Sequence, residues 1–303
     1  MGLLDGKVAV VTGAGHGIGR AHALELARQG ARVVVNDLGS SARGEGKSSA
    51  ADDTVGIIVE RGGEAVANYG DVADDDDAAA LIADAVEFGG KLDVLVNNAG
   101  IVRDAAIWNM TPDDFDAVMR VHVRGTWCCS RQAAMHWRDR AKAGERLSGR
   151  IINTTSGAGL TGNFGQSNYA TAKAAIVGLT QTLAIELAKI GVTANAIGPS
   201  GATRITATMP GAPPVRETDD ISGDDWDPWD PGNSSPLVAW LASDESGFVS
   251  GQVIRSIYDR IIWMHGWQEA AEASSGNARW DTETLGTTLL GKVFRTRAMG
   301  LGF

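Results

Sequence analysis

The segment from Ser156 to Lys173 contains three side chains whose types and spacing suit proton transfer. Tyr169 and Lys173 are four residues apart in a stretch predicted to turn helical at about Asn168, so both side chains lie on one helix face. A nearby ammonium group favours the phenolate, which predicts a pKa for Tyr169 below the ordinary tyrosine value of roughly 10. Tyr169 is therefore a candidate proton acceptor near neutral pH.

Ser156 is placed to act together with Tyr169. It follows the apolar run from Gly149 to Asn153, which is typical of a strand, and a serine at a strand end can face the start of the next helix. Both hydroxyls would then hold one substrate oxygen. The alternative interpretation is a loop serine, a half-buried helical tyrosine and a solvated lysine, because this spacing also occurs by chance.

A glycine-rich loop near the N-terminus predicts a phosphate-binding site. The valine-rich run from Lys7 to Thr12 is typical of a strand buried on both faces, and a helix is expected after it as far as Gln29. The glycines between them let the backbone approach a pyrophosphate, whose charge meets unpaired N–H groups at the helix N-terminus. The alternative is a glycine-rich turn without a ligand. The residues predicted to line the loop are Gly13, His16, Gly17, Ile18 and Gly19, with His16 contributing only its backbone.

Asp37 ends the next predicted strand, Arg32 to Asp37, about twenty residues after the glycine loop. A carboxylate at that position accepts hydrogen bonds from the adenosine ribose and repels a 2'-phosphate, so it predicts NAD as the cofactor rather than NADP. Two observations leave alternatives open. Asp37 could merely cap a turn, and Arg43 or Lys47 in the following polar loop could reach a 2'-phosphate.

The remaining pattern alternates helices with short apolar strands, which is typical of an α/β domain. Nothing in the 303 residues reads as a linker between two cores, so one domain with a tail is expected. Helices are predicted over residues 50–61, 75–88, from Thr111 onward, 168–190 and 234–243, and strands over residues 65–69, 94–98, 193–197 and 252–256.

Four motifs stand in the order and at the spacing of a known family. They are T-G-A-G-H-G-I-G at residues 12–19, N-N-A-G at residues 97–100, Ser156, and Y-A-T-A-K at residues 169–173. Through them, residues from about 5 to 255 resemble the classical short-chain dehydrogenase/reductase family. The resemblance implies a Rossmann-type, doubly wound parallel sheet, and roles for three residues: Ser156 fixes the substrate oxygen, Tyr169 takes the alcohol proton, and Lys173 holds the nicotinamide ribose.

The same resemblance implies further cofactor contacts. Asp71 and Val72 would contact the adenine, although Asp71 could equally cap a helix beside the acidic run at residues 74–77. A backbone group near Ala202 would meet the nicotinamide carboxamide, although many relatives have Pro-Gly where this chain has P-S-G-A. The implied contacts are Asp71, Val72, Asn98, Ala99, Gly100, Pro199 and Ala202, in addition to Tyr169 and Lys173. Asn97 is expected to be structural.

His122 departs from the family pattern, in which an asparagine orders a water in the proton relay. Either His122 takes part in the relay or it is a hydrogen-bonded core histidine. More narrowly, V-V-V-N-D-L-G at residues 33–39, V-H-V-R-G at 121–125 and G-N-F-G-Q-S-N-Y at 162–169 resemble the (3R)-hydroxyacyl-CoA dehydrogenase domain of peroxisomal multifunctional enzyme type 2.

This narrower resemblance implies a (3R)-3-hydroxyacyl-CoA substrate, with a bulky or steroid-derived acyl group as one possibility. A free hydroxysteroid or a 3-oxoacyl carrier protein remains an alternative, because one fold supports many substrates. An alternative from another class is a catalytically silent NAD-binding regulatory subunit. The family also implies a homodimer or homotetramer that uses the helices carrying His122 and Lys173 as its interface. No metal site is expected.

Two segments carry no family motif. Residues 205–236 hold six prolines and the acidic run D-D-W-D-P-W-D-P, so they are expected to form a long loop, either a functional lid or disordered. The family resemblance implies that this is the substrate loop, in which Trp226 and Trp229 either cover an apolar substrate or pack on the protein itself. Residues 1–256 are expected to form the Rossmann domain and residues 257–303 a C-terminal extension containing Trp263, Trp267 and Trp280.

The net charge of -10 argues against nucleic acid or an anionic membrane as partner, but it permits a local basic patch for a phosphorylated carrier. Cys128 and Cys129 are adjacent, and we interpret them as core residues in a reducing compartment. No apolar run approaches the roughly 20 residues of a membrane span. The first residues lack a signal-peptide pattern and the last lack a peroxisomal S-K-L-type address, so a cytoplasmic location is expected.

Overall fold

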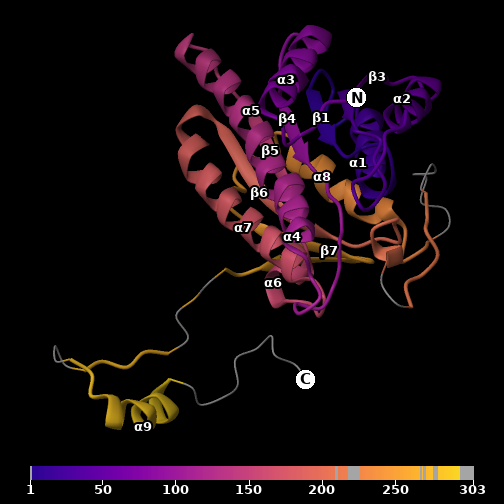
Figure 1. Ribbon diagram of the computed structural model, residues 1–303. Helices are drawn as coiled ribbons and strands as arrows, with labels where there is room; N and C mark the ends of the chain where they lie inside the picture. The colour runs from indigo at the N-terminus through magenta and orange to yellow at the C-terminus, as the bar shows by residue number, and fades with distance from the viewer. Residues whose placement is uncertain are drawn as a thin grey trace. The chain divides into compact units, whose positions relative to one another are not determined.

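The fold is that of a computed structural model, which describes residues 2–208, 211–217, 226–266, 268, 271–275 and 279–293. The chain divides into a first unit, Met1–Met264, and a second unit, His265–Phe303. The first unit contains one eight-stranded sheet in the order β3-β2-β1-β4-β5-β6-β7-β8 (Figure 1). The strands are β1 Val8–Thr12, β2 Arg32–Asn36, β3 Glu64–Asn68, β4 Val94–Asn97, β5 Gly149–Thr154, β6 Val192–Pro199, β7 Val253–Ile257 and β8 Arg260–Met264.

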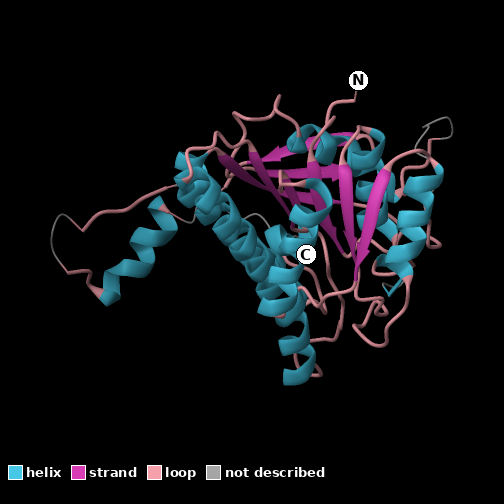
Figure 2. Ribbon diagram, turned by 90° about the horizontal axis from the view of Figure 1, so that it is seen from above, coloured by secondary structure: helices cyan, strands magenta, loops and turns pink. Residues whose placement is uncertain are grey.

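Helices cover both faces of this sheet (Figure 2). One face packs against α1 Gly17–Arg28, α2 Ala50–Glu60 and α8 Ser235–Ala242. The other face packs against α3 Asp75–Gly89, α5 Gly125–Lys142 and α7 Ser167–Leu187. Neighbouring strand residues point to opposite faces of the sheet. Val11 packs in the core formed with α1, α2 and α8, and Val10 in the core formed with α3, α5 and α7. The central strands are therefore apolar throughout. The predicted α/β, doubly wound parallel class is confirmed.

The strand order places a ligand site at one edge of the sheet. β1 pairs in parallel with both β2 and β4, so the chain direction across the sheet reverses between β1 and β4. In open α/β sheets of this kind, ligands bind outside the carboxyl ends of the strands at the point of reversal. The residues that follow β1, β2, β4, β5 and β6 therefore meet at one place.

β8 lies outside the predicted domain limit of residue 256. It is antiparallel to β7, with Ile254 opposite Trp263 and Ile257 opposite Arg260. The sheet thus continues past the last predicted strand, and the first unit ends at Met264. In the second unit, α9 Thr282–Lys292 is capped by the Asp281 carboxylate, which accepts a hydrogen bond from the backbone N–H of Glu283. Trp267 lies outside the described residues.

The long helix predicted from Thr111 is interrupted at its centre. Thr111 caps α4 Pro112–Met119 as expected, since its hydroxyl accepts a hydrogen bond from the backbone N–H of Asp114. A π-helical turn at Arg120–Arg124 then separates α4 from α5. Such turns occur frequently at functional sites, and this one carries His122.

Cys128 and Cys129 lie on α5 and are both fully buried free thiols, in agreement with their predicted place in the core. In the part of the chain that the structure describes, no helix combines the length and the apolar character that a membrane span requires.

Candidate active site

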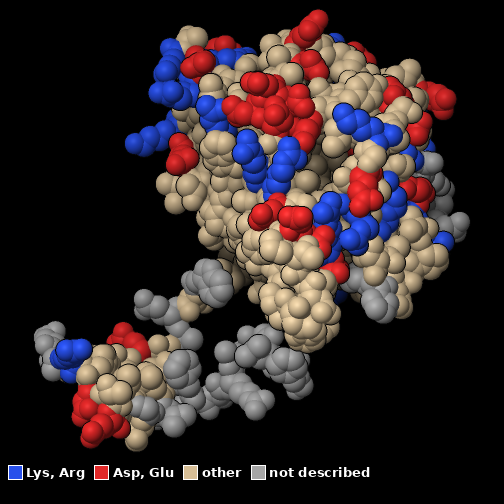
Figure 3. All heavy atoms as spheres, viewed as in Figure 1, with Lys and Arg blue, Asp and Glu red and all other residues tan. Residues whose placement is uncertain are grey.

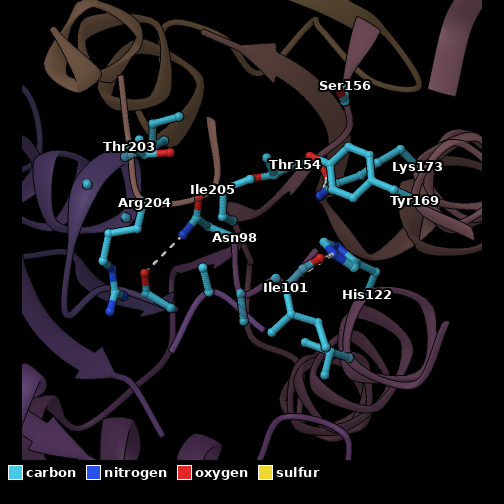
Figure 4. Close-up of a pocket in the computed structure, with 18 of the residues that line it drawn as sticks. Asn98, Ile101, His122, Thr154, Ser156, Tyr169, Lys173, Thr203, Arg204 and Ile205 are labelled. Carbon is cyan, nitrogen blue, oxygen red and sulfur yellow. Dashed lines mark hydrogen bonds between the residues drawn. The ribbon is translucent and has the colours of Figure 1, made fainter. Parts of the chain in front are cut away.

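One cavity of about 670 Å³ at the carboxyl ends of the strands brings the predicted site residues together. All of them line this cavity except Ala202. Figure 4 shows the Tyr169 and Lys173 side chains side by side, with Thr154 and Ser156 on the neighbouring segment and His122 against Ile101. The predicted catalytic residues, Ser156, Tyr169 and Lys173, come from the segment after β5 and the first turns of α7.

Lys173 is held by the strand that precedes Ser156. Its ammonium nitrogen donates a hydrogen bond to the carbonyl oxygen of Thr154 at 2.7 Å and lies 5.5 Å from the centre of the Tyr169 ring. Ser156 is the N-cap of the short helix α6 Gly157–Thr161, where its hydroxyl accepts from the backbone N–H of Ala158 at 3.3 Å. These backbone contacts fix the serine and the lysine next to the Tyr169 side chain.

The predicted pKa of Tyr169 is wrong for this structure. Burial raises the pKa of Tyr169 to about 12, and the contact with the Ser156 hydroxyl, which lowers it, is the smaller effect. Burial also lowers the pKa of Lys173 to about 7. Desolvation disfavours the charged form of each group, so it acts against the phenolate and the ammonium alike. The phenol is therefore the dominant form of Tyr169 at neutral pH.

His122 is both a hydrogen-bonded core residue and a neighbour of Tyr169. Its Nε2 lies 2.8 Å from the carbonyl oxygen of Ile101, and its ring meets the Tyr169 ring edge-on at 5.2 Å between centres. Burial lowers the pKa of His122 to about 3, so the ring is neutral. The backbone N–H of Ile101 also lies 3.2 Å from Nε2, so the tautomer decides whether Nε2 donates to the carbonyl or accepts from this N–H. The other ring nitrogen, Nδ1, is buried and has no hydrogen-bond partner among the described residues.

The glycine loop fits a pyrophosphate. His16, the N-cap of α1, makes no side-chain capping hydrogen bond, and a β-carbon on Gly13 would lie 2.7 Å from the backbone of Ala99. A carboxylate already occupies this helix end, since the Glu217 side chain accepts from the backbone N–H of Gly17 at 3.1 Å and lies 3.3 Å from His16 Nδ1. The Glu217 carboxylate therefore lies at the helix end where the phosphates of a dinucleotide are predicted to bind.

Asp37 lines the cavity and also ties the loop together. One carboxylate oxygen accepts from the backbone N–H of Gly15 at 2.8 Å and the other from the N–H of Gly39 at 2.7 Å. Arg43 and Lys47, which could have reached a 2'-phosphate, do not line the cavity. Asp71 lines it next to Val72 and forms an ion pair with Arg120 at 2.7 Å.

The turn that follows β4 is held from within the protein. The Asn98 side chain donates to the carbonyl oxygens of Thr12 and Gly13. Asn97 donates to Ser130 and Asn153, in agreement with its predicted structural role. Asn98, Ala99 and Gly100 thereby keep their places along the cavity wall.

Ala202 does not itself line the cavity, although Gly201 and Thr203 on either side of it do, so the contact of a backbone group near Ala202 with a carboxamide stays a prediction. Its backbone N–H donates to the carbonyl of Trp229 at 2.8 Å and its carbonyl accepts from the N–H of Arg216 at 2.8 Å. Both backbone groups are thus already paired with the loop that follows. Pro199 lines the cavity as predicted, and Thr203 lies beyond Ala202 on the same wall.

The two tryptophans of the predicted substrate loop do not line the cavity. The Trp229 ring packs edge-on against Tyr258 at 5.1 Å between ring centres, which corresponds to the alternative interpretation of packing on the protein itself. Trp226 is exposed. From this loop, Ile205 lines the cavity.

Sequence reasoning missed the arginines of the cavity wall. Arg103, Arg120, Arg204 and Arg255 line it. No local motif surrounds these residues, and three of them, Arg103, Arg120 and Arg204, lie outside the strands, so only the folded chain brings them to the cavity. Arg255 lies on the last predicted strand, residues 252–256, but the sequence does not indicate which face of the sheet its side chain takes.

Comparison with known proteins agrees with this arrangement. Residues 7–211 match the short chain dehydrogenase family. Hydroxyacyl-CoA dehydrogenase ChsB1 of Mycobacterium tuberculosis is 43% identical over 288 residues, which is 94% of this chain and 88% of that protein. Peroxisomal multifunctional enzyme type 2 of Mus musculus is 42% identical over 241 residues, covering 79% of this chain but only 30% of the mouse protein.

A solved structure supports the same assignment. The crystal structure of a short chain dehydrogenase from Mycobacterium avium is 47% identical in sequence, with a TM-score of 0.86 and 98% of each chain covered. The match therefore extends over the sheet, the cavity and the segments beyond the family motifs. The chain belongs to the short-chain dehydrogenase family.

Proposed function

We propose that this protein is an NAD-dependent dehydrogenase that interconverts a (3R)-3-hydroxyacyl-CoA and the corresponding 3-oxoacyl-CoA. Family membership makes it an oxidoreductase that acts on CH–OH groups with a nicotinamide cofactor. The regulatory-subunit alternative is set aside, because Ser156, Tyr169 and Lys173 meet at one cavity. The similarity to a hydroxyacyl-CoA dehydrogenase over 94% of the chain supports the substrate class.

The charge of the cavity is the structural observation that carries the proposal. The chain has a net charge of -10, and Figure 3 shows patches of both signs on the first unit. The cavity wall nevertheless holds five basic side chains against two acidic ones, Asp37 and Asp71. A locally positive cleft on an acidic protein attracts polyanionic ligands, and a dinucleotide and a coenzyme A thioester are both of this kind.

The protein's own residues account for the proton transfer. In the oxidative direction, the Tyr169 oxygen accepts the hydroxyl proton while the Ser156 hydroxyl donates a hydrogen bond to the substrate oxygen. In the reductive direction, the Tyr169 phenol donates its proton to the forming alkoxide. Lys173 holds its place through Thr154 and can donate to the ribose of the cofactor. The bound nicotinamide supplies the hydride acceptor or donor.

The choice of NAD is supported by Asp37. Its carboxylate lines the cavity close to the glycine loop, where it would repel a 2'-phosphate. No side chain of Arg43 or Lys47 lines the cavity to offset that repulsion.

The test is a substrate panel followed by absorbance of the reduced nicotinamide. The purified protein is given NAD or NADP with (3R)- and (3S)-3-hydroxyacyl-CoA thioesters of several acyl sizes, beside free hydroxysteroids and a 3-hydroxyacyl carrier protein. We expect turnover with NAD and the (3R) thioesters. Turnover confined to steroids or to the carrier protein would overturn the proposed substrate, and turnover confined to NADP would overturn the cofactor.

A further inference from the structure

Arg255 occupies a space beside the catalytic serine that two glycines leave open. It lies on β7 opposite Gly198 of β6 and lines the cavity. A β-carbon on Gly198 would lie 3.3 Å from Cγ of Arg255, and one on Gly157 would lie 2.8 Å from its Nη2. The guanidinium therefore rests against the backbone of the residue that follows Ser156.

This guanidinium has no partner within the described residues. Its Nε is buried and makes no hydrogen bond. Two other arginines of the cavity wall show the contrast, since Arg120 pairs with Asp71 at 2.7 Å and Arg103 with Asp114 at 3.5 Å. A buried donor without an acceptor is unfavourable by about 1–3 kcal/mol. Because the Arg255 side chain lines the cavity, an acceptor that binds in the cavity can reach this guanidinium.

We propose that Arg255 determines specificity by binding the C1 oxygen of the acyl group, next to the reacting C3 oxygen held by Ser156 and Tyr169. The inference rests on the proposed function and deepens it. A 3-hydroxyacyl or 3-oxoacyl group places two oxygens on carbons separated by one methylene, and the site offers two separate sets of donors at neighbouring positions. A plain secondary alcohol would use only the first set.

The C1 oxygen can belong to a thioester carbonyl or to a free carboxylate, since the guanidinium donates to both. The experiment includes (3R)-3-hydroxybutyryl-CoA, free (3R)-3-hydroxybutyrate and butan-2-ol, which lacks the C1 oxygen. Three variants are compared with the unmodified enzyme. Arg255→Met removes the donors and keeps much of the apolar stem, Arg255→Lys keeps the charge, and Arg260→Met removes an exposed arginine of β8 that does not line the cavity.

For Arg255→Met we expect KM for the hydroxyacyl-CoA to rise about 10- to 100-fold, as for the loss of a hydrogen bond to a charged donor. Its kcat should change less, Arg255→Lys should recover part of the loss, and kcat/KM for butan-2-ol and every constant of Arg260→Met should stay within about twofold. A larger effect on the free acid than on the thioester would identify a carboxylate as the true partner of Arg255.

An equal loss for butan-2-ol and for the hydroxyacyl-CoA would overturn the inference, because Arg255 would then act only on structure. Unchanged constants in Arg255→Met would overturn it as well. Thermal unfolding and dinucleotide binding of each variant show whether the fold and the cofactor site are intact. Failure of the proposed function appears separately, as an unmodified enzyme that does not turn over the hydroxyacyl-CoA.

Discussion

Two walls of the cavity differ in how their polar atoms are partnered. The cofactor wall, formed by residues 13–19, Asp37 and Asn98, is hydrogen-bonded within the protein. Both carboxylate oxygens of Asp37 accept from backbone N–H groups, and the Asn98 amide donates to two backbone carbonyls. These hydrogen bonds set the shape of the loop before any ligand binds.

The proposed substrate wall, formed by His122, Thr154, Arg255 and the proposed catalytic residues, contains unpaired polar atoms. His122 Nδ1, Thr154 Oγ1 and Arg255 Nε are buried and have no hydrogen-bond partner in the described part of the chain. Each such atom is unfavourable by about 1–3 kcal/mol. The cofactor wall therefore gains stability from its internal hydrogen bonds. The substrate wall instead contains polar groups that lower the stability of the free protein and that a ligand can satisfy.

The largest expected effect is a loss of turnover without a loss of dinucleotide binding. Tyr169→Phe should lower kcat about 10²- to 10⁴-fold, because it removes the proton-transferring oxygen of the substrate wall. The phenyl ring should keep its packing against His122, so dinucleotide binding, measured by fluorescence titration, should stay within about twofold. Unchanged turnover would show that another group transfers the proton, and an equal loss of dinucleotide affinity would show that the two walls are not independent.

The pH dependence of the two reaction directions is expected to differ. With a pKa of about 12, Tyr169 is almost wholly phenol at neutral pH, so the proton-accepting form grows about tenfold with each pH unit. Alcohol oxidation, measured as kcat/KM between pH 6 and pH 8, should therefore rise about 100-fold, whereas ketone reduction should not rise. A plateau of the oxidation rate from about pH 7 would instead support the lowered tyrosine pKa predicted from sequence.

Asp37→Ala should change both cofactor choice and stability. The preference for NAD over NADP, as a ratio of kcat/KM values, should fall about tenfold because the carboxylate no longer repels the 2'-phosphate. The free energy of unfolding should fall by about 1–3 kcal/mol, since the buried N–H of Gly15 loses its acceptor. Asp37→Asn is the matched control. It removes the charge but keeps one oxygen, so it should alter cofactor choice with a smaller loss of stability.

If neither Asp37→Ala nor Asp37→Asn changed the preference for NAD over NADP, the proposed role of Asp37 would be contradicted. In that case the polar loop with Arg43 and Lys47 would be the next place to examine by substitution.

The smallest expected effect concerns Glu217, whose carboxylate lies at the N-terminus of α1 in the cofactor wall. Glu217→Gln should strengthen dinucleotide binding about two- to fivefold, because the carboxylate of Glu217 competes with the phosphates for the N–H of Gly17. Glu245→Gln, which removes the same charge from an exposed position outside the cavity, serves as the control. Weaker binding in Glu217→Gln would show that this side chain holds its segment in place for the cofactor.

Sequence patterns predicted most of the cofactor wall because its signals are local. A buried strand followed by glycines and a strand ending in Asp37 are read within a few residues, and the sheet then places them together. β8 had no such signal. The turn before it contains Tyr258 with a positive φ of 55°, a conformation that glycine or asparagine usually adopts. The turn therefore lacks the residue types that predict a hairpin from sequence.

The substrate wall was harder to predict because its properties arise from packing. The spacing of Tyr169 and Lys173 was visible, but the pKa of each depends on how much water the folded chain removes. The position of Arg255 depends on the register of β7 against β6 and on a glycine 98 residues earlier in the chain. The hydrogen bonds of the Ala202 backbone could not be predicted either, since the loop that supplies their partners follows no local pattern.

The adjacent thiols of α5 allow the packing of this helix against the sheet to be measured without an engineered cysteine. Cys128 and Cys129 are the only cysteines of the chain, both are 0% exposed, and burial raises the pKa of Cys129 to about 12. A thiol-labelling reagent needs the thiolate and access to the sulfur. The labelling rate of the native protein therefore reports how often α5 separates from the sheet, and its dependence on bound dinucleotide reports whether that opening is linked to the site.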